Sequence, residues 1–126
     1  NFLKKNELNE AEEFFLKSYT ISKDVFTENH PSTALVIYHL ALVDVEKNQL
    51  TKAEESLKKS LSINKNFFND NHHIIAKIYK SLGDVESKQN NFNKANNYYK
   101  KSIQIISELF GENHPTINVI KSEIKN

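Results

Sequence analysis

The sequence of 126 residues contains no cysteine, no methionine and no tryptophan, and it has only two glycines and two prolines. Without cysteine the chain can form neither a disulfide framework nor a thiolate metal site, which mildly favours a reducing compartment. With only Gly83 and Gly111 it cannot build a glycine-rich loop that holds phosphates. We therefore predict a cytoplasmic protein that needs no cofactor.

Arginine is also absent, because all 17 basic residues are lysines. The planar fork that reads guanine edges or grips a phosphate at two points is therefore missing. Lysines and the 16 acidic residues are mixed along the chain and leave a net charge of +1. The longest apolar stretch, residues 34–43, is interrupted by His39 and is far shorter than the ~20 residues of a membrane span. We expect neither nucleic acid nor a membrane as partner.

A repeat with a step of 42 residues is the main feature that is present. Segments 28–31, 70–73 and 112–115 align at this step, and apolar, aromatic and alanine positions recur in the same frame. The recurring sets are His30, His72 and His114; Ala11, Ala53 and Ala95; Leu8, Leu50 and Phe92; Phe15, Leu57 and Tyr99; and Phe26, Phe68 and Phe110. Five ladders in one frame predict an array of similar structural units.

Each unit is predicted to contain two amphipathic helices. The first covers residues 31–47 and again 73–89, and it opens with Pro or His after an Asn, which suits Asn as N-cap. The second covers residues 51–68 and 93–110, with apolar residues at spacings of three and four. Such a hairpin cannot bury its apolar face alone, so each unit relies on its neighbour.

Capping boxes and small residues refine this prediction. Thr51 with Glu54, and Asn9 with Glu12, have the spacing at which two side chains cap each other's free backbone N–H. Small side chains let two helix backbones approach closely. The expected packing residues are Ala41 and Gly83 with the adjacent Leu40 and Leu82 in the first helices, and Ala11, Ala53 and Ala95 in the second helices.

The unit His30-Pro31-x-x-Ala34, followed by Leu40-Ala41 and by Leu50-x-x-Ala53-Glu54-x-x-Leu57, resembles the tetratricopeptide repeat, in the longer form of kinesin light chains. The resemblance runs from about residue 6 to residue 117 and implies an all-α, right-handed solenoid of about six helices. The turn glycine usual in that family is Asn at positions 6, 48 and 90, and Asp44 and Glu86 replace an aromatic residue.

The frame predicts one array over residues 1–126. Residues 1–26 would hold the tail of a truncated repeat and its second helix, residues 27–68 and 69–110 two full repeats, and residues 111–126 a capping helix. The last segment keeps a single apolar stripe but places Lys121 and Lys125 where another helix would pack. We expect the array to end near residue 126 and to extend upstream of residue 1.

The resemblance implies that the first helices line a concave surface that binds a protein or peptide. Its inward positions are Leu35, Tyr38, Leu42, Val45 and Glu46 in one helix and Lys77, Lys80, Asp84, Ser87 and Lys88 in the other, with His39 nearby. This surface suits a peptide with an apolar anchor flanked by acidic residues. Alternatively, Leu35 and Leu42 pack against another element and the lysines form a solvated face. The carboxylate clamp of co-chaperones is not expected, because of its positions only Lys80 fits.

Catalysis finds no support in the sequence. His30, His72 and His114 are a full repeat apart and mark helix starts, so they cannot share a metal ion. No nucleophile, base and stabiliser stand in a known motif. Two alternatives to peptide binding stay open: self-association through apolar groups such as Leu8 and Phe15 at the N-terminal edge, and a regulatory or targeting role within a larger enzyme or motor-associated protein.

Overall fold

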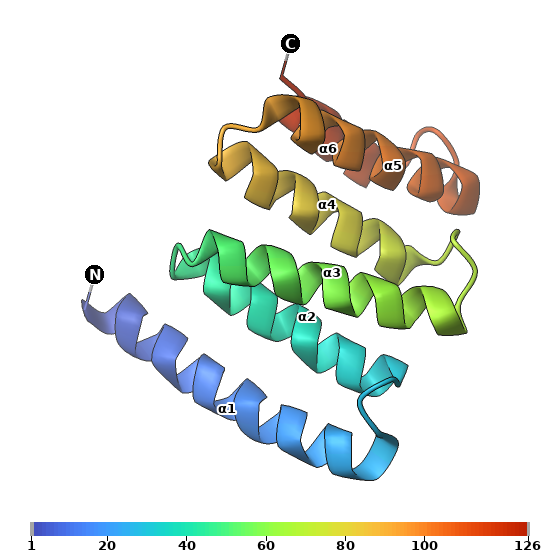
Figure 1. Ribbon diagram of the computed structural model, residues 1–126. Helices are drawn as coiled ribbons and strands as arrows, with labels where there is room; N and C mark the ends of the chain where they lie inside the picture. The colour runs from blue at the N-terminus through green and yellow to red at the C-terminus, as the bar shows by residue number, and fades with distance from the viewer. Residues whose placement is uncertain (1, 126) are drawn as a thin grey trace. The chain divides into compact units, whose positions relative to one another are not determined.

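The computed structural model describes residues 2–125, with side chains from Lys4 onward. These residues form helices and no strand, which confirms the predicted all-α class. The helices are α1 (Phe2–Phe26), α2 (Pro31–Glu46), α3 (Leu50–Phe67), α4 (His73–Lys88), α5 (Phe92–Phe110) and α6 (Pro115–Glu123) (Figure 1). None of these helices combines the length and the apolar character that a bilayer crossing requires.

The chain divides into two compact units, which we describe separately. Unit 1 runs to Phe67 and contains α1, α2 and α3, and unit 2 runs from Phe68 and contains α4, α5 and α6. In unit 1, α2 packs against both α1 and α3, and in unit 2, α5 packs against both α4 and α6. Each unit therefore has one central helix with a neighbour on two sides.

Histidine, and not the predicted asparagine, caps the start of α2, α4 and α6. His30, His72 and His114 hold the N-cap position, with extended backbone angles, and each Nδ1 accepts a hydrogen bond from the backbone N–H two residues later. The donors are Ser32, Ile74 and Thr116, at 3.0, 3.2 and 3.2 Å. The imidazole Nδ1 offers an acceptor comparable to that of an asparagine side chain, so the preceding Asn is not needed for the cap.

A phenylalanine four residues earlier holds each capping histidine. The ring centroids of Phe68 and His72 are 3.9 Å apart, and those of Phe26 and His30 are 4.7 Å apart. The third pair, Phe110 and His114, lies at 5.0 Å. The recurring Phe therefore packs on the histidine that caps the next helix.

The turns after α2 and α4 are left-handed at asparagine. Asn48 has φ 62° and Asn90 has φ 64°. The N–H of Asn48 bonds to the carbonyl of Val45, and the N–H of Gln49 bonds to the carbonyl of Asp44, at 2.9 and 2.8 Å. The same pair of bonds recurs after α4. This is the Schellman pattern, with Asn in the place where glycine is the most frequent residue.

The third predicted turn, at Asn6, is wrong, because α1 continues unbroken through it. Lys4, Lys5, Glu7 and Leu8 around it are good helix formers, and an asparagine alone does not end a helix. The two expected capping boxes are also wrong. Residues 9–12 lie inside α1, and Thr51 is already the second residue of α3.

Serine hydroxyls and small residues join the helices within each unit. Ser60 Oγ of α3 donates to the carbonyl of Ala34 in α2 at 2.8 Å, and Ser102 Oγ of α5 donates to the carbonyl of Ala76 in α4 at 2.7 Å. A Cβ added at Gly83 would lie 2.5 Å from the ring of Tyr99, so α4 and α5 approach closely there. Ala41, Ala53, Ala95 and Leu82 are buried, whereas Leu40 and Ala11 are half-buried.

The end of the described chain is attached to α5. Ile117 and Ile120 of α6 are buried, while Lys121 is exposed. The side-chain amide of Asn96 donates to the carbonyl of Lys125 at 2.5 Å and accepts from its N–H at 3.1 Å. Residues 115–125 therefore lie along α5 in unit 2.

Candidate functional site

A row of apolar side chains remains partly open on α2 in unit 1. We call Leu35, Tyr38, Leu42 and Val45 the α2 surface; Leu35 is 44% exposed and the other three are half-buried. Their spacings of three and four residues place them on one side of the helix. The adjoining side, roughly 90° around the helix, carries Ala34, Ile37 and Ala41 and is buried. Four of the predicted partner-binding residues therefore share one accessible face.

His39 lies at the contact between α2 and α1. Its ring stacks on Phe15 with centroids 5.2 Å apart and planes inclined by 9°, and the ring of Tyr38 approaches it edge-on at 5.5 Å. Phe15 is half-buried in this contact, and Leu8 is also half-buried. Stacking on His39 therefore covers part of the predicted opening at Phe15, and self-association through this edge stays a prediction.

The predicted basic residues of α4 divide into two groups. Lys77 and Lys88 are exposed. Lys80 Nζ instead lies 2.7 Å from Asp84 Oδ2, and the Tyr99 hydroxyl donates to Asp84 Oδ1, also at 2.7 Å. One predicted lysine and the predicted carboxylate are thus already engaged within unit 2.

The Tyr99 end of this hydrogen bond is shielded from water. The Tyr99 side chain is buried, and this burial together with the bond to Asp84 raises the pKa of its phenol well above the usual value of a tyrosine. The phenol therefore stays protonated and keeps donating to Asp84 over the physiological range. Asp84 is held by two donors and acts as a bridge between α4 and α5.

Two acidic residues are buried at equivalent places near the ends of α2 and α4. Asp44 is 3% exposed and Glu86 is 2% exposed. Burial raises the pKa of Asp44, and Lys52, 3.8 Å away, acts in the opposite direction. Neither carboxylate opens onto a surface, so we assign both to the packing of the two units.

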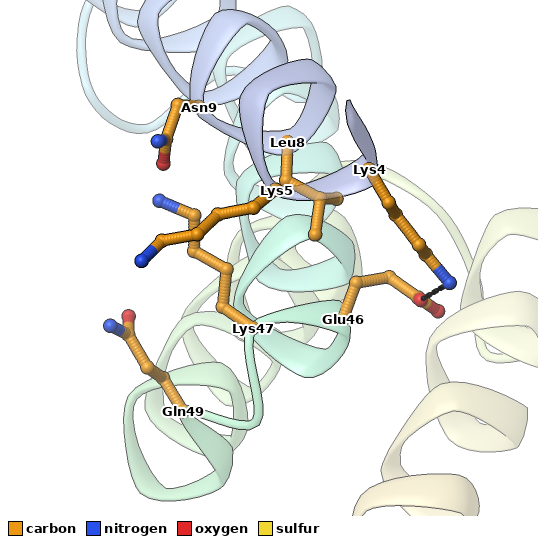
Figure 2. A pocket seen from close by; sticks show the side chains of 7 residues that line it. All are labelled: Lys4, Lys5, Leu8, Asn9, Glu46, Lys47 and Gln49. Carbon is orange, nitrogen blue, oxygen red and sulfur yellow. Dashed lines mark ion pairs between the residues drawn. The ribbon is translucent and has the colours of Figure 1, made fainter. Parts of the chain in front are cut away.

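An open pocket of about 440 Å³ lies in unit 1 between the start of α1 and the end of α2 (Figure 2). Lys4 lies 3.4 Å from Glu46, and Lys47 lies 3.2 Å from Glu12, so carboxylates neutralise two of its cations. None of the α2 surface residues lines it; the lining residues are Lys4, Lys5, Leu8, Asn9, Glu46, Lys47 and Gln49. The pocket is therefore separate from the predicted site.

A charge cluster around Glu28 in unit 1 is also structural. The Tyr19 hydroxyl of α1 donates to both carboxylate oxygens of Glu28 at 2.9 and 2.8 Å, and Lys59 of α3 pairs with the same carboxylate. The hydrogen bonds from Lys59 and Tyr19 lower the pKa of Glu28. This cluster ties the loop before α2 to both of its neighbouring helices.

The histidines do not gather into a site. His30, His72 and His114 each cap a different helix. Within residues 2–125, no group of three or more histidine, aspartate or glutamate side chains is placed to hold a metal ion.

Comparisons with known proteins support a repeat fold. A family model described as tetratricopeptide repeat matches residues 2–66 and again residues 37–108. A Podospora anserina protein described as a kinesin light chain, with nearly identical tetratricopeptide-like repeats, has a TM-score of 0.84 and 17% sequence identity, covering 96% of this chain and 57% of that chain. BtubC (BKLC) from P. vanneervenii has a TM-score of 0.82 and 18% identity, covering 94% of this chain and 46% of that chain.

The chain thus spans about half the length of these two solved relatives. No curated protein matches the sequence. At such low identity the structural likeness concerns the fold alone, and it confirms the predicted all-α repeat fold and the resemblance to repeats of the kinesin light chain kind.

Proposed function

Because this chain belongs to the tetratricopeptide repeat family, whose folds generally mediate contacts between proteins, we propose that it is a non-catalytic module that binds a peptide or protein segment through its first helices. The α2 surface would take an apolar anchor, and the exposed lysines of α4 would attract acidic residues of the partner.

The exposure of the α2 surface carries this proposal. Leu35 is 44% exposed, and it lies in one row with the partly open Tyr38, Leu42 and Val45. Grouped apolar side chains on a helix face are costly to leave in water and are typical of interaction sites. Burying one large apolar side chain of a partner on this row would contribute about 1.5–3 kcal/mol. The row is therefore suited to a leucine or aromatic anchor.

The charges of α4 favour a partner with acidic residues. Lys77 and Lys88 are exposed, so they can raise the association rate of a negatively charged segment. Lys80 contributes less in this proposal, because its ammonium already lies against Asp84. Surface lysines steer an acidic partner more than they hold it, so the apolar anchor would supply most of the affinity.

A peptide series tests the proposal. Synthetic peptides with one central Leu or Phe, flanked by either Glu or Lys, are titrated against the labelled 126-residue chain and followed by fluorescence anisotropy. We expect the Glu-flanked peptides to bind and the Lys-flanked peptides to bind at least about tenfold more weakly. Leu35→Glu should weaken binding of the Glu-flanked peptide at least about tenfold, since it places a charge in the apolar row.

Val119→Glu is the matched control, because Val119 is an apolar residue of α6 that is 56% exposed and lies outside the α2 surface. Its affinity should stay within about twofold of the parent chain. Lys77→Glu should weaken only the Glu-flanked peptides, and the loss should shrink at high salt. Equal affinity for both peptide sets, or a Leu35→Glu variant that binds like the parent, would show that this surface is not the site.

A further inference from the structure

Helix α1 carries an exposed apolar row that the α2 surface does not include. Phe14, Ile21 and Val25 are 64%, 64% and 66% exposed, and the half-buried Ser18 lies between them along the helix. Spacings of three, four and seven residues place these four side chains on one side of α1. We call Phe14, Ser18, Ile21 and Val25 the α1 stripe.

The same register is buried in α3, the third helix of unit 1. Ser60 and Ile63 of α3 stand 42 residues after Ser18 and Ile21. Ser60 is fully buried, and its hydroxyl donates to the carbonyl of Ala34 in α2. Ile63 is 3% exposed and belongs to the buried cluster around Ala34. In α3 this register is thus the face that packs against the first helix of its own repeat.

Unit 2 repeats this arrangement independently. Ser102, at the next step of 42, is fully buried and donates to the carbonyl of Ala76 in α4. Tyr98, which corresponds to Phe14, stacks on Tyr79 of α4 with ring centroids 6.1 Å apart. Two helices of the chain therefore use the register of the α1 stripe in the same way, each against a helix with alanine at the contact.

The contact between α1 and α2 leaves the stripe open. It uses Phe15, which stacks on His39, and Tyr19, which packs against the cluster of Ala34. These side chains point roughly 90° around the helix from the stripe, since each residue advances the helix by about 100°. By contrast, α5 in unit 2 packs against helices on two sides, α4 and α6.

We propose that the α1 stripe binds an amphipathic helix with a β-branched residue, an alanine and, three residues after the alanine, a large apolar residue. Thr33-Ala34-x-x-Ile37 and Ile75-Ala76-x-x-Tyr79 are the two helices of this kind that the chain already packs against the equivalent register. Alanine lets the backbones approach until the serine hydroxyl reaches a carbonyl, and the large residue covers the position of Phe14.

The serine is available for this role. Ser18 Oγ donates to the carbonyl of Phe14 in its own helix at 3.0 Å, and a change of its χ1 rotamer would direct it toward a docked helix. This surface lies on another helix than the α2 surface, so the inference does not depend on the proposed function. Leu35→Glu should accordingly leave helix binding at the α1 stripe unchanged.

A peptide from the chain itself serves as the probe. A fluorescent peptide of residues 69–91, which contains α4 with its His72 cap, is titrated against the 126-residue chain and followed by anisotropy. We expect saturable binding of this peptide to the parent chain. Ile21→Glu in the chain should weaken the affinity at least about tenfold, and Ala76→Leu in the peptide should also weaken it at least about tenfold. Leu16→Glu is the matched control, since Leu16 is 49% exposed on the other side of α1, and its affinity should stay within about twofold.

Because the peptide must fold as it binds, a linked version provides a second measurement. In a hybrid chain, residues 69–91 are placed directly before Leu8, the position that corresponds to Phe92 in the repeat. We expect its melting temperature to rise above that of the parent chain, and Ile21→Glu to remove the rise.

Three results would overturn the inference. The first is no saturable binding up to about 1 mM peptide together with no gain in the hybrid. The second is an equal loss in Ile21→Glu and Leu16→Glu. The third is a dimer of the chain alone, seen by sedimentation, that Ile21→Glu abolishes while the peptide does not bind, since this would assign the stripe to a second copy.

Discussion

The asparagine of each inter-helix turn shows how one residue determines where a helix ends. Asn48 and Asn90 adopt positive φ and place two backbone N–H groups against the last free carbonyls of the preceding helix. Asparagine tolerates this conformation better than other residues with a Cβ, and glycine adopts it at no steric cost. The chain thus forms two tight turns, and neither of its two glycines lies in them.

Substitutions at Asn48 test this conclusion. Asn48→Val should lower the free energy of unfolding by about 1–2 kcal/mol, because a β-branched residue is strained at φ 62°. Asn48→Gly should be neutral or stabilising by up to about 1 kcal/mol. Urea unfolding followed by circular dichroism measures both changes.

Asn6→Val is the matched control for this substitution. Asn6 occupies the same place in the repeat, but it lies within α1 and is exposed. Its replacement should change stability by less than about 0.5 kcal/mol. A large loss at position 6, or no loss in Asn48→Val, would contradict the different roles that we assign to the two asparagines.

At the scale of the helix, the histidine caps recur at every step of the repeat. Each cap requires an Nδ1 without a proton, since a protonated imidazole has no acceptor. Burial lowers the pKa of His72 below its ordinary value of 6.5, and the charge of the neighbouring His73 has a smaller effect in the same direction. The folded chain therefore prefers the neutral imidazole at the start of α4.

Stability should consequently depend on pH around this residue. Since the folded state has the lower pKa, the unfolded state binds more protons as the pH falls through 6.5 toward the folded pKa, and stability is lost in that window. The contribution is fully present above pH 6.5. His72→Asn keeps a capping acceptor without titrating, so its unfolding free energy should fall less than that of the parent chain between about pH 7.5 and 5.

Urea unfolding over this pH range provides the measurement, and His73→Asn is the control. The side chain of His73 is exposed and does not cap the helix. If His73→Asn and His72→Asn flattened the pH dependence equally, the capping role of His72 would not explain it. Replacing the cap by His72→Ala should cost about 1 kcal/mol at pH 7.5.

The same scale shows what the sequence could predict. The alternation of helices, the ends of α2 to α5 to within about one residue and the positions of the histidines followed from caps and apolar spacing, which are local signals. The capping helix, expected over residues 111–126, covers only Pro115–Glu123. The prediction of a turn at Asn6 is wrong because it rests on the alignment with Asn48 and Asn90, whereas the residues around Asn6 favour a helix. The pairing of Lys80 with Asp84 had a local signal, since lysine and aspartate four residues apart face each other on a helix.

Other features depend on which helix lies opposite. The stacking of His39 on Phe15 and the bond from Tyr99 to Asp84 join residues of different helices, and no spacing within one helix reveals them. The sequence predicts a close approach at Gly83, but it does not indicate that the neighbour there is the ring of Tyr99. The exposed α1 stripe was missed, although its register repeats that of Ser60 and Ser102.

At the scale of the whole chain, repeats that contact mainly their neighbours should respond locally to damage. Ser60 and Ser102 offer matched sites, because each is fully buried and donates to a carbonyl of the preceding helix. Replacing either by alanine leaves the space nearly unchanged but removes one buried hydrogen bond, which should cost about 0.5–1.5 kcal/mol.

Hydrogen exchange of the backbone amides locates the response. Ser60→Ala should lower protection first in α2 and α3, and Ser102→Ala should lower it first in α4 and α5. Ser18→Ala is the control, because the hydroxyl of Ser18 donates only within its own helix and its loss should change protection little. A uniform loss of protection over all helices in both variants would indicate one cooperative unit instead.

Membership of the repeat family explains why a chain with 17% identity to a solved relative has the same fold. Its repeats need small residues at close contacts, a cap at the start of each first helix and a left-handed turn, and these requirements leave most surface positions free to vary. The partner surface is therefore the part of the molecule that family membership specifies least, and it has to be identified by binding experiments.

The buried hydroxyl of Tyr99 gives the chain an optical signal of its own. There is no tryptophan among the 126 residues, so tyrosine dominates the near-ultraviolet absorption. Phenolate absorbs at longer wavelength than phenol, and Tyr99 keeps its proton to a higher pH than an exposed tyrosine as long as α4 and α5 stay together. An alkaline spectrophotometric titration should therefore show Tyr99 as the last phenol to ionise, after Tyr19, whose pKa is raised less. Earlier ionisation of Tyr99 would report the separation of α4 and α5 without any added label.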